Sequence, residues 1–99
     1  MISFHRTACI KAGMMVEAMA VAIEFVGCVK RVADVDLRVE VPVGGNPWRI
    51  RWSFQYPDLA AMERAGIALM ADPTYLALLA KIAEYVISGA STDEVWRSS

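Results

Sequence analysis

Few residues of this chain have side chains that could do chemistry, and their types indicate acid–base catalysis or the binding of anionic or aromatic molecules. The single histidine, His5, could act as a general base or ligate a haem iron. Arginine side chains hold carboxylates and enolates through paired hydrogen bonds, and aromatic side chains line pockets for flat ligands. The candidate ligand-binding residues are therefore Arg38, Arg49, Arg51, Gln55, Trp52 and Tyr75.

Each candidate also has a structural explanation that involves no ligand. His5 could make a hydrogen bond within an interface between two copies of the chain. The arginines and Glu40 could form cross-strand ion pairs, each contributing about 0.2–1 kcal/mol, or they could pair across such an interface. Aromatic side chains at alternate positions are typical of a hydrophobic core, which would account for Trp52 and its neighbours.

Other kinds of site are excluded by residue spacing. His5 and Cys9 would point the same way on a strand but lie about 13 Å apart, which is too far for a catalytic dyad. Cys9 and Cys28 form no CxxC pair and no cysteine–histidine cluster with zinc spacing, which predicts reduced thiols. Because the chain has no glycine-rich phosphate loop, nucleophile elbow or carboxylate metal motif, we predict neither a metal site nor a cofactor.

Composition predicts one domain that associates with a partner. The chain has 99 residues, enough for a single core, yet 57% of them are hydrophobic, which is more than a small monomer can hide. A net charge of −1 argues against general nucleic-acid binding. The stretch before Cys28 loosely resembles a signal segment, but Glu17 and Glu24 interrupt it, so we expect a cytoplasmic protein with no membrane partner.

The elements that must position the candidate residues are organised around residues 35–56. Hydrophobic side chains occupy every second position of residues 35–43 and of residues 48–56, and a turn sequence, GGNP, separates the two runs. This alternation predicts a β-hairpin with one face against helices. We expect any function on the other, polar face, which carries Arg38, Glu40, Arg49, Arg51, Ser53 and Gln55.

The segment before the hairpin predicts a strand and a long helix. Residues 2–10 alternate between hydrophobic and polar side chains, and Arg6 alone interrupts the hydrophobic set. Residues 14–32 predict a helix, because hydrophobic side chains recur every three to four positions. The expected buried stripe of this helix consists of Met15, Met19, Ile23 and Val26.

Two capping signals predict where the later helical segments begin. Asp58 is a good N-cap, and Asp72 before Pro73 restarts the helix, since proline is tolerated only in a first turn. Residues 91–99, which include Trp96, predict a short last strand. The resulting order is the βαββαβ pattern of α+β, ferredoxin-like folds, in which an antiparallel sheet carries both helical segments on one face.

Four segments of the chain carry a resemblance to a known superfamily: WSFQY (52–56) at the end of the hairpin, DLAAME (58–63), ADPTY (71–75) and the closing EVWR (94–97). They resemble the dimeric α/β-barrel superfamily, which includes antibiotic-biosynthesis-monooxygenase-like and NIPSNAP-like proteins. The resemblance implies a homodimer whose two sheets pack bare face to bare face, and a cavity between each sheet and its helices. Haem-degrading relatives place a ligand histidine on a helix, and the predicted helices here contain none.

Three functions are consistent with these features. The leading interpretation is a small homodimer of unassigned activity that binds a small apolar or aromatic molecule. The first alternative is a cofactor-independent monooxygenase-like enzyme, in which a pocket and its few polar groups position an acidic small-molecule substrate that supplies the reactivity. The second alternative is a partner-binding module that adds a strand at its sheet edge.

Overall fold

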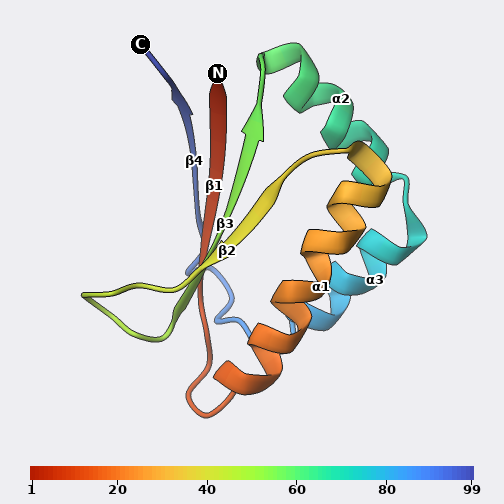
Figure 1. The fold of residues 1–99 in the computed structure, drawn as a ribbon. Coiled ribbons are helices and arrows are strands. Elements are labelled where there is room, and N and C mark those ends of the chain that lie inside the picture. The colour runs from red at the N-terminus through yellow and green to blue at the C-terminus, as the bar shows by residue number, and fades with distance from the viewer.

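The computed structural model describes all 99 residues as one antiparallel sheet with helices on one of its faces (Figure 1). The strands lie in the order β2-β3-β1-β4, so the first and third strands are central, as the ferredoxin-like prediction requires. The second helical segment is divided into two helices. In chain order the elements are β1 (Ile2–Cys9), α1 (Met15–Ala33), β2 (Leu37–Glu40), β3 (Arg49–Tyr56), α2 (Leu59–Met70), α3 (Pro73–Ile82) and β4 (Thr92–Arg97).

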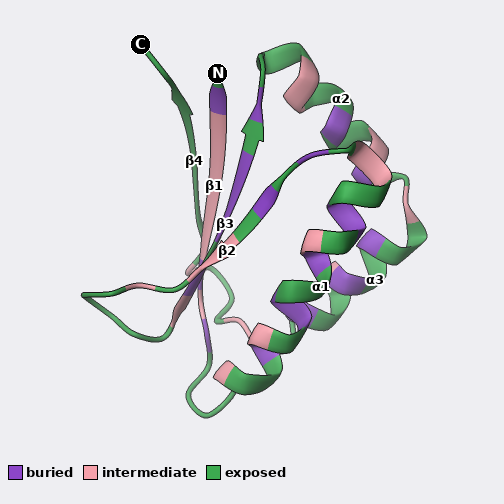
Figure 2. Ribbon diagram, viewed as in Figure 1, coloured by how far each residue is buried: buried purple, intermediate pink, exposed green.

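The alternation along β1 and β3 decides which side chains enter the core. Ile50, Trp52, Phe54 and Tyr56 of β3 are all buried against the helices, as the predicted hairpin face requires (Figure 2). Alternate residues point to the opposite side of the sheet, which no element covers. We call that side the open face; it carries Ser3, His5, Thr7, Cys9, Arg38, Glu40, Arg49, Arg51, Ser53, Gln55, Glu94 and Trp96.

The first strand of the hairpin is shorter than the sequence pattern predicts. Alternation runs through residues 35–43, but β2 ends at Glu40. Pro42 has no N–H to donate to a ladder, which ends the pairing. Residues 41–48 therefore form a long loop that projects from the sheet (Figure 1), and within it Val41, Val43 and Trp48 are exposed.

The predicted buried stripe of α1 is correct only in part. Met15, Met19 and Val26 are partly buried against the core, but Ile23 is 57% exposed, and the fully buried positions include Ala18, Ala22 and Phe25. Nearly every position of this helix is hydrophobic, so periodicity alone cannot select a face. Packing selects the face with alanines, because their small side chains let neighbouring elements approach the helix backbone closely.

Both predicted caps of the later helices are confirmed. Asp58 accepts a hydrogen bond from the Ala61 N–H at 2.8 Å, and Asp72 accepts one from the Tyr75 N–H at 2.9 Å. The helices that these caps start, α2 and α3, meet at 85°. Neither α1 nor any other single helix is long and apolar enough to span a membrane; α2 and α3 reach that length and composition only as a bent pair.

Candidate functional site

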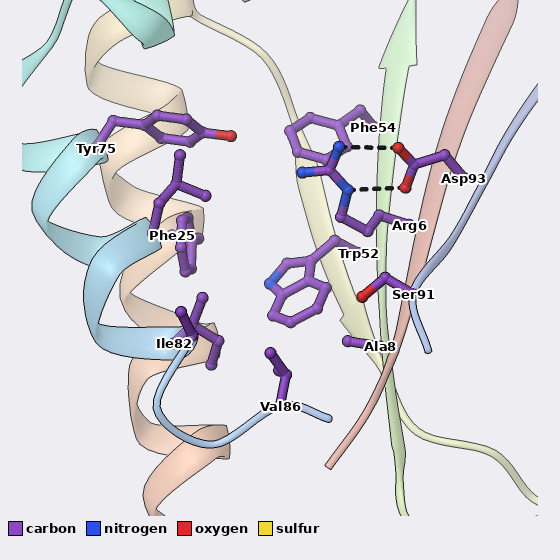
Figure 3. Close-up of a pocket in the computed structure, with 12 residues that line it drawn as sticks. Arg6, Ala8, Phe25, Trp52, Phe54, Tyr75, Ile82, Val86, Ser91 and Asp93 are labelled. Atoms are coloured by element: carbon purple, nitrogen blue, oxygen red, sulfur yellow. Dashed lines mark hydrogen bonds and ion pairs between the residues drawn. The ribbon is translucent and has the colours of Figure 1, made fainter. Parts of the chain in front are cut away.

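A cavity of about 380 Å³ lies between the helix-covered side of the sheet and helices α1 and α3 (Figure 3). Its walls are mostly apolar, because β1 and β3 present their hydrophobic faces to it while α3 closes the other side. Nine of its twelve lining residues are hydrophobic. The lining residues are Arg6, Ala8, Phe25, Trp52, Phe54, Tyr75, Leu79, Ile82, Ala83, Val86, Ser91 and Asp93.

Aromatic contacts fix the shape of the cavity wall. Phe25 meets Trp52 at a centroid distance of 6.0 Å and Tyr75 at 5.6 Å, and both pairs are edge to face. Such contacts contribute about 0.5–1.5 kcal/mol each beyond the burial of area. Phe25 thereby ties together residues of α1, β3 and α3, so the wall is formed before any ligand enters.

An ion pair forms the polar part of the wall. Arg6 donates to both carboxylate oxygens of Asp93, from Nε at 2.8 Å and from Nη2 at 2.9 Å. The two residues face each other in the β1–β4 register, and their side chains are 44% and 46% exposed, which places them at the rim. The hydrogen bonds from Arg6 are the main cause that lowers the pKa of Asp93, so this carboxylate stays charged.

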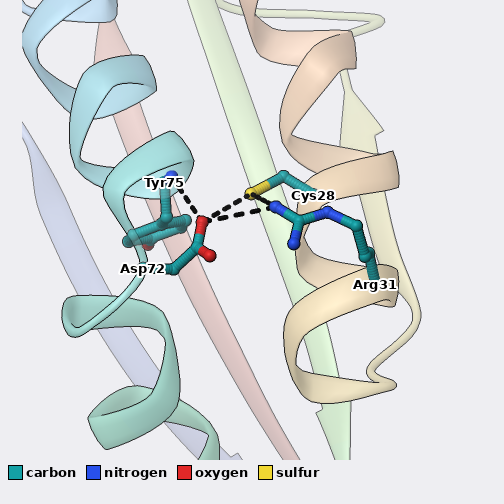
Figure 4. Close-up of polar contacts among 4 residues, drawn as sticks. All are labelled: Cys28, Arg31, Asp72 and Tyr75. Atoms are coloured by element: carbon teal, nitrogen blue, oxygen red, sulfur yellow. Dashed lines mark hydrogen bonds and ion pairs between the residues drawn. The ribbon is translucent and has the colours of Figure 1, made fainter.

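A second polar cluster holds the cap of α3 against α1 (Figure 4). Asp72 accepts hydrogen bonds from the Tyr75 N–H and from Arg31 Nη2, the latter at 3.4 Å, and lies 3.9 Å from the Cys28 sulfur. Burial raises the pKa of the Cys28 thiol, which keeps the thiol protonated and poorly reactive. The cluster therefore positions Tyr75 in the cavity wall and offers no nucleophile.

The sheet divides the residues that the sequence singled out. Trp52 and Tyr75 line the cavity. The side chains of His5, Arg38, Arg49, Arg51 and Gln55 lie on the open face, on the other side of the sheet. A ligand in the cavity therefore meets two of the seven candidates directly.

On the open face, four side chains form a continuous hydrogen-bonded chain across three strands. His5 Nδ1 lies 2.9 Å from Ser53 Oγ, and the Ser53 hydroxyl donates to Glu40. Since that hydroxyl proton is committed to Glu40, His5 donates from Nδ1 to Ser53. Arg51 donates to both oxygens of Glu40, at 3.1 and 3.4 Å. This is the reverse of a nucleophilic triad, in which histidine accepts the serine proton.

This chain makes a contribution to stability that depends on pH. The Ser53 hydroxyl is the main cause that lowers the pKa of Glu40, and Arg51 adds to it. A carboxyl group with a lowered pKa in the folded state stabilises fully above its unfolded pKa, about 4.3, and the contribution is lost as pH falls through the folded pKa.

We therefore expect Glu40→Gln to lower the melting temperature at pH 7 and to have little effect near pH 3. The measurement is thermal unfolding of both proteins from pH 3 to 7. Ser53→Ala removes the main cause of the pKa shift. In that background, the difference in melting temperature caused by Glu40→Gln should depend less on pH. A constant difference between wild type and Glu40→Gln over this range would contradict the assignment.

The cavity residues that sequence reasoning missed include Arg6, Phe25 and Asp93. Arg6 did leave a signal, since it is the one charged residue within the hydrophobic set of β1. A charge at such a position requires a partner, and the β1–β4 register supplies Asp93. Phe25 gave no comparable signal, because its helix is hydrophobic on most sides.

Comparison with known proteins shows likeness in structure only. No family model matches the sequence, and no curated protein matches it. A NIPSNAP domain protein from Burkholderia xenovorans superposes with a TM-score of 0.85 at 21% identity, over 100% of this chain and 95% of that one. A NIPSNAP family protein of unknown function from Agrobacterium tumefaciens superposes with a TM-score of 0.83 at 20% identity, over 100% of this chain and 88% of that one. An antibiotic biosynthesis monooxygenase superposes with a TM-score of 0.71 at 17% identity, over 100% of this chain and 99% of that one.

These similarities confirm the predicted resemblance at the level of the fold. The chain has the ferredoxin-like α+β fold that NIPSNAP domain proteins and antibiotic-biosynthesis-monooxygenase-like proteins share. No activity has been assigned to the NIPSNAP relatives that it resembles.

Proposed function

We propose that this protein is a homodimer whose subunits each bind a small apolar or aromatic molecule in the cavity between the sheet and helices α1 and α3. The cavity itself carries the proposal. Its volume of about 380 Å³ falls within the range of about 300–1,000 Å³ that is usual for small-molecule sites. Its mostly hydrophobic wall with one polar rim is also the usual composition of such sites.

The arrangement of the wall supports binding over simple core packing. In an ordinary core, side chains would fill a space of this size, because protein interiors pack about as densely as organic crystals. Here the aromatic rings of Phe25, Trp52 and Tyr75 hold one another at the edge of the space. A ligand that enters removes apolar surface from water at about 25 cal/mol per Å² without first having to open the site.

The exposed hydrophobic residues of the open face support the homodimer. Trp96 lies opposite Ser3 in the β1–β4 register and therefore shares its face; it is 60% exposed. The projecting loop adds the exposed Val41, Val43 and Trp48. Aromatic and apolar residues around a face of this kind are typical of interfaces between subunits. A second copy that packs open face to open face would cover them.

We place the protein in the cytoplasm. Cys9 and Cys28 are free thiols in the fold, and Cys9 lies on β1 while Cys28 lies on α1. Free, unpaired cysteines are usual in a reducing compartment.

Filling the cavity should abolish binding of an apolar probe. Ala83 lines the cavity and Ala80 does not, so Ala83→Phe places a ring in the space and Ala80→Phe adds the same ring to the outer side of the same helical segment. With the uncharged probe N-phenyl-1-naphthylamine, we expect fluorescence enhancement for wild type and Ala80→Phe, and at least about a tenfold weaker affinity for Ala83→Phe.

Two outcomes would contradict the proposed binding site. One is the absence of probe binding to the wild-type protein. The other is equal binding to wild type and Ala83→Phe when circular dichroism shows both to be folded, since the probe would then occupy a different surface.

The likeness in fold to an antibiotic biosynthesis monooxygenase favours one second candidate, a cofactor-independent oxygenase that uses the same cavity. The cavity rim would position the substrate, and the substrate would supply the reactivity. Oxygen uptake with a panel of autoxidisable phenols separates the two functions. Oxygen uptake faster than in buffer alone supports the oxygenase if Ala83→Phe abolishes that uptake. Probe binding without oxygen uptake supports a binding protein.

A further inference from the structure

The wall of the cavity contains a buried hydrogen-bond donor that has no acceptor. Trp52 is 6% exposed, and its Nε1 is the one buried side-chain nitrogen or oxygen in the molecule without a hydrogen-bond partner. Leaving such a donor unpaired costs free energy, so unpaired buried donors are rare and call for an explanation. In Figure 3 the indole nitrogen lies on the side of the ring that faces the space between the sheet and the helices.

No neighbouring side chain satisfies this donor. Phe25, which meets the Trp52 ring edge to face at 6.0 Å, offers at most a weak contact through its π face. Arg6 has only donors. The carboxylate of Asp93 accepts from Arg6, and no oxygen of the protein accepts a hydrogen bond from Trp52 Nε1. A molecule that enters the cavity can supply the acceptor that the protein itself does not.

The same ion pair also bears on the charge of that molecule. The guanidinium of Arg6 and the carboxylate of Asp93 neutralise each other, so the cavity has no uncompensated charge. A ligand carboxylate would have to displace Asp93 from Arg6 or lie beside the Asp93 carboxylate. The first leaves Asp93 unpaired and the second places two negative charges together, so both arrangements are unfavourable. An uncharged acceptor requires neither. Figure 3 shows the remaining guanidinium nitrogen of Arg6 on the cavity side, where it could donate to a second acceptor.

We propose that the ligand is an uncharged molecule with an apolar skeleton and an acceptor oxygen, such as a ketone, and that Trp52 Nε1–H donates to this oxygen. This inference rests on the proposed function, since it assumes that the cavity is the binding site. The nitrogen is itself buried in the empty cavity, so the side chains around it must shift slightly when the oxygen binds. The apolar wall then supplies most of the affinity, and the indole supplies selectivity for the oxygen.

Three matched probes test the inference: fluorene, 9-fluorenone and fluorene-9-carboxylate. They share one flat skeleton and differ in having no acceptor, an uncharged acceptor or a charged one. By isothermal titration calorimetry we expect the wild-type protein to bind fluorenone about tenfold more tightly than fluorene, as one net hydrogen bond allows. The carboxylate should bind least tightly.

The variant Trp52→Phe removes the donor and keeps an aromatic ring in the wall. It should bind fluorene and fluorenone with equal affinity, whereas the control Trp48→Phe, in the projecting loop, should keep the tenfold preference. If Trp52→Phe does not fold, the ¹H–¹⁵N signal of the Trp52 indole in the wild-type protein replaces it. Fluorenone should then move the N–H proton of that signal downfield, as a new hydrogen bond does, whereas fluorene, which has no acceptor, should not move it in that direction.

The outcomes separate the two proposals. If fluorene binds and fluorenone binds no more tightly, the donor role of Trp52 is wrong while the cavity stands as a binding site. That result would also follow if the Phe25 ring already satisfied the N–H. Tightest binding of the carboxylate would overturn the inference that the ligand is uncharged. If none of the three probes binds, the proposed function fails as well.

Discussion

If the protein is the homodimer we propose, Trp96→Glu should convert it into a monomer. Trp96 lies on the open face and is 60% exposed in a single subunit. Large aromatic residues that become buried in an interface can contribute about 2 kcal/mol or more to binding. A glutamate at this position also introduces a charge that would be desolvated in the interface. Together these effects should raise the dimer dissociation constant by about 100-fold or more.

The measurement is the molar mass by size-exclusion chromatography with light scattering near micromolar concentration. Wild type should elute at about twice the subunit mass of 10.9 kDa. The matched control is Val16→Glu, which makes the same kind of change at an 81% exposed position of α1, away from the open face, and should remain a dimer. A monomeric wild type would contradict the homodimer and would favour a surface that docks a different partner.

The second large effect is expected from Phe25→Ala. Phe25 is 4% exposed and is the contact through which α1 meets both Trp52 and Tyr75. Truncation of a buried phenylalanine costs about 3–5 kcal/mol, because transfer energy is lost and a void remains. Since small domains are stable by only about 5–15 kcal/mol, the variant should lose a large share of its free energy of unfolding.

Urea unfolding monitored by circular dichroism measures this loss. Phe25→Leu, which keeps most of the buried volume but loses the edge-to-face contacts, should cost clearly less than the alanine variant. A loss below about 1 kcal/mol for Phe25→Ala would mean that the existing cavity absorbs the void without cost. Phe25 would then not be the residue that fixes the cavity wall.

Much of the fold could be predicted from the sequence because several elements carry local signals. The alternation that ends at Tyr56 assigns the faces of β3. Asp58 and Asp72 mark the starts of α2 and α3, because each side chain can accept a hydrogen bond from a backbone N–H of the first helical turn. Those signals depend on neighbours in the chain. The buried face of α1 does not, since it is decided by packing against segments far away in sequence. The early end of β2 did have a local signal in Pro42, which the alternation of residues 35–43 outweighed.

The candidate site could be predicted only in part for the same reason. Trp52 and Tyr75 were found because aromatic residues stand out, but nothing local indicates that they share a wall with Phe25. Arg6 and Asp93 are 87 residues apart and meet only through the strand register. The conspicuous arginines of the hairpin alternate with the buried residues of their own strands, so they lie across the sheet from the cavity.

The three tryptophans report on three separate places and so allow one direct test of the central claim that ligand occupies the cavity. Trp52 lines the cavity, Trp48 lies in the projecting loop, and Trp96 lies on the open face. The measurement is a titration of ¹⁵N-labelled protein with N-phenyl-1-naphthylamine, with the indole signals assigned through Trp48→Phe and Trp96→Phe. We predict that the Trp52 signal moves and the other two stay in place. Movement of Trp48 or Trp96 alone, or of none, would contradict ligand binding in the cavity.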